Sequence, residues 1–220
     1  MNKMLLLLSA ACLGLAVPAV FAQEAAPAAP AVAPAPAPVP SKTVDDLSPA
    51  DTMMLLAMSA VGGEVQCDRL ESGAEDAAPS VLGEQEYVVD LFSRLEKLNI
   101  PGNYQGYITE YLAVQRRILE EMKKPGLSEQ EQTRVAESHM AEVDAIEEKY
   151  SDVIAVLMQA DALIPVLLMK EGTNDVVMSF IQNEGDMLAE QGADAFNLAV
   201  TRRTSAFLRE RIEALRKTVK

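Results

Sequence analysis

The stretch VIAVLMQADALIPVLLM, residues 153–169, is the most apolar run of the chain after its first 22 residues. Only Gln159, Asp161 and Pro165 interrupt it. A membrane span needs about 18 or more apolar residues, and a carboxylate at a bilayer centre costs about 2.5–3.5 kcal/mol. We therefore predict a buried core helix with Asp161 facing water or a partner, and no integral membrane span in the mature chain. Pro165 lacks a backbone donor and predicts a kink or helix end near Ile164.

The helical pattern extends far to the N-terminal side of this run. Ser128-Glu129-Gln130-Glu131 forms a capping box, which typically opens a helix. We predict one continuous helix over residues 129–164, roughly 54 Å long at a rise of about 1.5 Å per residue. The side chains expected on its inward seam are Val135, His139, Val143, Ile146, Tyr150, Val153, Leu157 and Ile164.

Two helical patterns and a helix start precede this long helix. Ser48 caps a helix with Pro49 at its first position, and this apolar helix is expected to stop at Gly62-Gly63. Apolar residues at steps of three and four predict further helices over residues 83–98 and 104–123. All three patterns predict elements that cover the central run.

Two more helices are expected after the run. Thr173 is placed to cap the first of them, and Gly185 is expected to kink it. Gly192 separates it from a last helix over residues 193–218. Short connections favour antiparallel neighbours, so we predict an all-α antiparallel bundle of about five to seven helices with one long central helix. The predicted core contains Met54, Leu55, Leu91, Leu95, Ile108, Val143, Ile146, Leu157 and Phe180.

The N-terminal part predicts export. Residues 1–22 have the form of a signal peptide, with Lys3, an apolar core and small residues before Gln23. Residues 23–42 are rich in Ala and Pro and are predicted to be a disordered linker, and residues 43–220 to be the helical bundle domain. The expected location is periplasmic or otherwise extracytoplasmic, and either cleavage or retention of the signal as an anchor fits the sequence.

The charge distribution limits the classes of partner that the chain is expected to bind. The net charge of −14 argues against general binding of nucleic acid, whose phosphates are bound by Lys and Arg. Residues 201–220 depart from this balance, with seven basic and two acidic residues. Either a basic surface for an anionic partner or a solvated helix face explains them. The arginines of that candidate surface are Arg202, Arg203, Arg209 and Arg211.

Cleavage of the signal would leave Cys67 as the only cysteine. An unpaired cysteine in an exported protein indicates either a free thiol or an intermolecular bridge. A buried, inert Cys67 and a Cys67 disulfide dimer are the two alternatives. A closed structural zinc site is not expected from one thiol.

Candidate ligand-binding side chains are few. Met53, Met54 and Met58 form a cluster that fits either core packing or a Cu(I) site, because thioethers bind Cu(I). His139, the only histidine, lies on a helix seam and is either a core residue or a metal ligand. No cofactor is expected. A stripe of tyrosines either stacks on a glycan or peptide or packs at the rim of the core; it consists of Tyr104, Tyr107 and Tyr111.

Motifs for catalysis by a nucleophilic serine, a zinc site or a phosphate-binding loop are absent from the sequence. Glu137-Ser138 and Leu157-Met158-Gln159 are similar to pieces of lytic transglycosylases, but the spacing is longer and a glycine is missing. The helix starts at Ser48 and Ser128 are similar to those of small periplasmic helical chaperones, which have a glutamine where this chain has acidic residues. A capping box accounts for both starts, so neither family is assigned.

We therefore expect an exported, non-catalytic protein with an interaction or scaffolding role. Its partner would be a protein of the cell envelope or a second copy of the chain. The alternatives are a ligand-binding module, either a chaperone-like client binder or a Cu(I) binder, and an envelope hydrolase.

Overall fold

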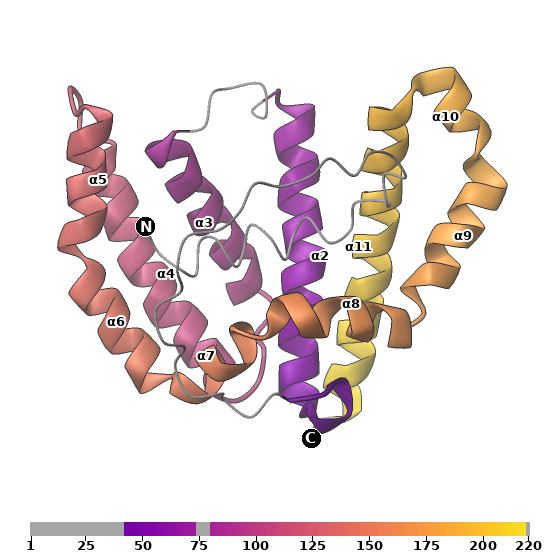
Figure 1. Cartoon of the computed structure of the whole chain (residues 1–220). Helices are drawn as coiled ribbons and strands as arrows, with labels where there is room; N and C mark the ends of the chain where they lie inside the picture. Colours follow the sequence, from indigo (N-terminus) through magenta and orange to yellow (C-terminus); the bar gives the residue numbers. More distant parts are fainter. Residues whose placement is uncertain (1–41, 74–79, 219–220) are drawn as a thin grey trace, which may run out of the picture.

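The computed structural model describes residues 42–73 and 80–218, and within them the chain is all-α, as predicted (Figure 1). The predicted signal peptide and the predicted linker up to residue 41 lie outside the described residues. The elements are η1 (Val44–Asp46), α2 (Pro49–Glu71), α3 (Val81–Glu96), α4 (Asn103–Met122), α5 (Glu129–Ser138), α6 (Met140–Lys149), α7 (Ser151–Leu157), α8 (Ala160–Lys170), α9 (Thr173–Glu184), α10 (Asp186–Gln191) and α11 (Ala193–Thr218).

The centre of the bundle is α2, which packs most extensively against α11 and also contacts α3 and α8. In Figure 1 it stands between the α3–α4 pair on one side and α11 on the other. Its sequence is apolar nearly all round, and both Met53 and Leu56 are completely buried. A helix without a polar face must be covered on every side, which explains its central position.

The predicted helix starts are present. Ser48 Oγ accepts a hydrogen bond from the backbone N–H of Asp51, and the Asp51 carboxylate accepts one from the N–H of Ser48. Ser128 and Glu131 form the same reciprocal pair at the start of α5. Each capping box satisfies backbone donors that a helix start leaves free.

The helix was expected to stop at Gly62-Gly63, and this prediction was wrong. α2 continues through both glycines to Glu71, and both are buried. A glycine inside a helix costs roughly 1 kcal/mol relative to alanine. Burial of Val65 and Cys67 in the next turn offsets this local preference.

The prediction of one continuous helix over residues 129–164 was also wrong. The chain divides there into α5, α6, α7 and the first part of α8, with breaks at His139, Tyr150 and Met158-Gln159. The predicted seam still faces inward, since Val143, Ile146 and Val153 are all buried. The four short helices therefore curve around the outside of the bundle, as Figure 1 shows.

At two of these breaks a side chain donates a hydrogen bond to a main-chain carbonyl of the preceding turn, which weakens the helix there. Ser138 Oγ donates to the carbonyl of Val135 at 2.7 Å, and the N–H of His139 turns to the carbonyl of Ala136. In the second break, the side-chain amide of Gln159 donates to the carbonyl of Ala155 at 2.6 Å. Competition of this kind interrupts the regular pattern of bonds four residues apart.

The predicted helix end near Ile164 does not occur, because α8 continues through Pro165 to Lys170. Asp161 and Pro165 lie on the exposed side of the helix, where water can satisfy the carbonyl that the proline leaves without a donor. Within the described residues no single helix is long and apolar enough to cross a membrane. Only α7 and α8 together reach that length and composition, and they are bent by 68° at their break.

The C-terminal elements follow the predicted division at Gly185 and Gly192. Thr173 does not cap α9, however, because its hydroxyl donates to the carbonyl of Leu168 and Gly172 occupies the capping position. Eight of the nine predicted core residues are buried. The exception is Phe180, which is half-buried and packs edge-on against Phe196 with ring centroids 5.5 Å apart.

Candidate functional site

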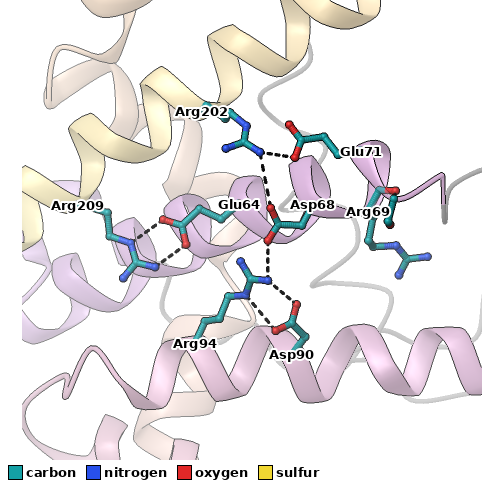
Figure 2. Close-up of polar contacts among 9 residues, drawn as sticks. Glu64, Asp68, Arg69, Glu71, Asp90, Arg94, Arg202 and Arg209 are labelled. Atoms are coloured by element: carbon teal, nitrogen blue, oxygen red, sulfur yellow. Dashed lines mark hydrogen bonds and ion pairs between the residues drawn. The ribbon is translucent and has the colours of Figure 1, made fainter.

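A network of ion pairs joins three helices at one end of α2 (Figure 2). Arg209 of α11 makes a two-pronged pair with Glu64 of α2, with Nε–Oε1 and Nη2–Oε2 distances of 2.8 and 2.6 Å. Only 31% of the Arg209 side chain and 29% of the Glu64 side chain are exposed. This geometry matches the planar guanidinium to the carboxylate and fixes the register of α11 on α2.

The carboxylate of Asp68, one turn further along α2, lies between two arginines. Arg94 of α3 approaches it at 2.8 Å and Arg202 of α11 at 3.8 Å. Arg94 also pairs with Asp90 of its own helix, and Arg202 pairs with Glu71 at 2.6 Å. Exposed ion pairs contribute at most about 1 kcal/mol each, so the network serves mainly to align α3 and α11 on α2.

This arrangement changes the interpretation of the basic C-terminal stretch. The predicted binding residues Arg202 and Arg209 already have carboxylate partners within the chain, and Arg211 is held by Glu171 at 2.7 Å. Arg203 is exposed and makes no ion pair with any residue in the described ranges. An anionic partner would therefore have to displace internal carboxylates from three of the four arginines.

Cys67 lies beside this network, under an open hollow of ≈ 260 Å³. The residue is 1% exposed, and its thiol points to the carbonyl of Leu198 at 3.8 Å. Burial raises the pKa of the Cys67 thiol, against a smaller opposing effect of Arg202. A buried thiol with a raised pKa is a poor nucleophile, so this geometry supports the inert alternative and not the disulfide dimer. The hollow is lined by Glu64, Cys67, Asp68, Arg94, Arg202, Ser205 and Ala206.

The predicted tyrosine stripe belongs to the core. Tyr104 is 4% exposed, and Tyr107 and Tyr111 are completely buried. The rings of Tyr107 and Tyr111 both pack against Phe92, with centroids 6.2 and 4.6 Å from it. These rings therefore cannot stack on a glycan or peptide unless the bundle opens.

The candidate metal ligands are also placed in packing or ion-pair roles. Met53, Met54 and Met58 are buried within the main core, where a thioether fills space between apolar neighbours. His139 lies between two carboxylates, with Nε2 3.3 Å from Glu121 and Nδ1 3.6 Å from Glu142. In the part of the chain that the structure describes, no group of three or more His, Cys, Asp or Glu side chains is arranged to hold a metal ion.

Exposed apolar side chains gather instead on the elements that follow the break at Gln159. The exposed fractions in α8 are 48% for Val166 and 58% for Met169, and Met158 just before α8 is 59% exposed. α9 and α10 also carry exposed apolar side chains, although they were expected only as further helices of the bundle. The residues on these two helices are Met178, Ile181 and Leu188, which are 53%, 38% and 49% exposed, and we call them the outer face.

Among the described residues, other helices cover α9 and α10 from one side only, which leaves the outer face exposed. α9 and α10 pack on α11, and α9 also touches α8, but Thr173 is their only fully buried residue. Figure 1 shows both helices at the edge of the molecule, beyond α11 and away from α3 and α4. Contiguous exposed apolar patches mark interaction sites, and Met178 and Ile181 are neighbours on the surface of α9.

No family model, no curated protein and no solved structure matches this chain. The outer face was missed at the level of sequence because apolar residues in α9 and α10 were assumed to face a core. One signal was present, since the stretch between Lys170 and Arg202 contains no basic residue. A solvent-exposed helix face with internal ion pairs typically carries both charge signs, and this stretch carries one.

Proposed function

We propose that this chain is an exported, non-catalytic interaction protein of the cell envelope, and that it holds a protein partner on the outer face of α9 and α10. The observation that carries the proposal is the contrast in burial between the two ends of the chain. The apolar side chains of α2, α3 and α4 are almost all enclosed, whereas Met178 and Leu188 have about half of their surface in water.

The exposure of these residues costs free energy that a partner would recover. Burial of apolar surface contributes roughly 25 cal/mol per Å² of area removed from water. A methionine or leucine that stays half exposed gains only part of this stabilisation, and a docked partner would supply the rest. The half-buried Phe180 packs on Phe196 of α11 with ring centroids 5.5 Å apart, which joins α9 to α11. A face that is already positioned before binding loses less conformational freedom when a partner docks.

A chaperone-like client binder is the second candidate. It is favoured by the number of exposed methionines, since Met158, Met169 and Met178 are each more than half exposed. The flexible thioether adapts to unrelated apolar surfaces, and surfaces that bind many partners use it often. The two candidates differ in the number of partners held, and the chaperone-like surface would also include Met158, just before α8, and Met169 in α8.

Site-specific photo-cross-linking of the full-length chain in cells tests both candidates. The cross-linker replaces Met178 or Leu188 in two samples, and replaces exposed Glu137 or Glu148 in the control samples. The control positions lie on α5 and α6, at the opposite edge of the molecule (Figure 1).

One dominant adduct, formed from the outer face and not from the control positions, is the expected result for a dedicated interaction protein. A broad set of unrelated adducts from the outer face alone would favour the chaperone-like alternative. The same adducts from all four positions, or adducts only from α5 and α6, would contradict the proposal.

A further inference from the structure

We propose that the outer face binds a basic amphipathic helix, that is, a partner segment with one apolar side flanked by Lys and Arg. This inference rests on the function proposed above and names the chemical class of the partner. It combines the apolar geometry of α9 and α10 with the distribution of charge around them.

The exposed apolar residues of α9 and α10 suit a partner helix laid alongside these two helices. Met178 and Ile181 are three residues apart in α9, so their side chains lie on neighbouring positions of one helix surface. Leu188 follows in α10, after the break at Gly185. A partner helix that presents apolar residues at steps of three and four would meet this row in the way that helices dock on apolar surfaces.

The charged residues of the segment that carries this row are all negative. Between Lys170 and Arg202 the sequence has six acidic residues and no basic residue. Asp175 precedes Met178 by one turn, and Glu184 follows Ile181 by one turn, so both carboxylates are neighbours of the outer face. In α10, Asp186 and Glu190 lie on either side of Leu188 in sequence, and both are exposed.

These carboxylates are free to meet a partner. No ion pair within the described ranges involves Asp175, Glu184, Asp186 or Glu190. The neighbouring Glu171 differs, because it is 12% exposed and paired with Arg211. Arg211 is thus paired within the bundle, and four carboxylates of α9 and α10 make no ion pair within the described ranges.

This charge pattern distinguishes the possible occupants. A second copy of the chain would bring four more carboxylates to the same contact, and like charges at an interface are repulsive. An anionic membrane surface would be repelled for the same reason. A helix with basic flanks neutralises the rim while its apolar side covers Met178, Ile181 and Leu188.

The test uses the purified full chain and two fluorescent amphipathic helical peptides with the same leucine side. One peptide has Lys and the other Glu on its polar side, and binding is followed by fluorescence anisotropy at low and high salt. The rim variant carries Asp175→Asn, Glu184→Gln, Asp186→Asn and Glu190→Gln. The control variant removes four exposed carboxylates of α5 and α6, through Glu129→Gln, Glu137→Gln, Asp144→Asn and Glu148→Gln.

At low salt, the parent chain should bind the Lys peptide at least about tenfold more tightly than the Glu peptide. The rim variant should lose about tenfold in affinity for the Lys peptide. The control variant should keep most of the preference for the Lys peptide. The variant Met178→Ser/Ile181→Ser/Leu188→Ser should lose both peptides. Equal binding of both peptides to the outer face would overturn the basic class of partner while leaving an interaction face in place.

Three other results would also overturn the inference. These are an equal loss in the rim and control variants, binding of neither peptide, and binding of vesicles rich in anionic lipid in place of the Lys peptide. The in-cell cross-linking of Met178 and Leu188 judges the interaction role independently of all of them, because it does not depend on the charge of the partner.

Discussion

Gly106 of α4 lies directly against the side chain of Tyr150, the residue at which α6 gives way to α7. A Cβ atom placed on Gly106 would lie 2.7 Å from Tyr150 Oη and 3.2 Å from its Cζ. The same hydroxyl donates to Glu110 Oε1 at 2.8 Å, which holds the ring in place. The absence of a side chain at Gly106 thus lets the curved outer helices approach α4.

Replacement of Gly106 by alanine is therefore expected to destabilise the bundle. Alanine in a helix normally stabilises by up to about 1 kcal/mol relative to glycine, but overpacking of a fixed ring costs typically about 1–3 kcal/mol. Urea unfolding should show that Gly106→Ala has a free energy of unfolding about 1 kcal/mol lower than that of the parent. Tyr150→Phe in the same chain should recover part of this loss, and a Gly106→Ala protein more stable than the parent would contradict this packing.

Acid should weaken the bundle through Asp51. Burial alone would raise the pKa of this carboxyl, but hydrogen bonds from Tyr104 at 2.7 Å, Lys42 at 3.0 Å and the N–H of Ser48 more than offset burial and hold its pKa below the usual range. A carboxyl with a lowered pKa in the folded state stabilises the fold above its unfolded pKa of about 3.9, and this contribution is lost as pH falls through the folded value.

Asp51→Asn should therefore cost about 1–3 kcal/mol at pH 7, and the difference from the parent should shrink below about pH 4. Thermal unfolding at a series of pH values measures this. Asp161→Asn removes an exposed carboxylate from α8 and serves as the control. Its thermal stability should equal that of the parent at every pH. A constant difference between Asp51→Asn and the parent from neutral to acid pH would show that the charge of Asp51 is not what stabilises the contact.

Glu147 of α6 is expected to act in the opposite direction. Burial, and secondly the nearby charge of Asp144, raise the pKa of Glu147, and one of its oxygens is buried with no hydrogen-bond partner among the described residues. A raised pKa in the folded state means that stability is lost as pH rises through that value. Glu147→Gln should raise the free energy of unfolding at pH 7, measured with urea, by less than about 1 kcal/mol. This gain in stability should vanish in acid. A loss of stability at pH 7 would contradict it.

The thiol of Cys67 should react slowly in the folded protein. It is almost fully buried and its pKa is raised, so attack on a disulfide reagent requires local opening of α2 and α11. Ellman's reagent should modify the native chain at least about tenfold more slowly than the urea-unfolded chain. A non-reducing gel should show the monomer. Equal rates, or a band of dimer that disappears with reductant, would restore the disulfide alternative.

The sequence predicts the positions of side chains in this fold better than the path of the backbone. Steps of three and four place Val143, Ile146 and Val153 inward correctly. The same steps cannot distinguish a straight helix from short helices that curve around a bundle. At two of the breaks, Ser138 and Gln159 donate side-chain hydrogen bonds to carbonyls of the preceding turn, and a hydrophobic pattern does not report such bonds.

The candidate site was less predictable for a related reason. Seven basic residues within 20 positions look like a free surface, but the partners of Arg202 and Arg209 lie 131 and 145 residues away in sequence. The pairing follows from the packing of α11 on α2, which no local pattern shows. The exposure of Met178 and Leu188 likewise depends on which side of α9 and α10 the rest of the chain covers.

The most direct test of the central claim is a comparison of stability and partner capture in one variant, Met178→Ser/Ile181→Ser/Leu188→Ser. Exposed substitutions usually change stability by no more than about 0.5 kcal/mol each, so its unfolding midpoint should stay close to that of the parent. Cross-linking from a retained position, Asp175, should lose the dominant adduct. A variant that unfolds as easily as a core variant, or one that keeps the adduct in full, would contradict an interaction role for the outer face.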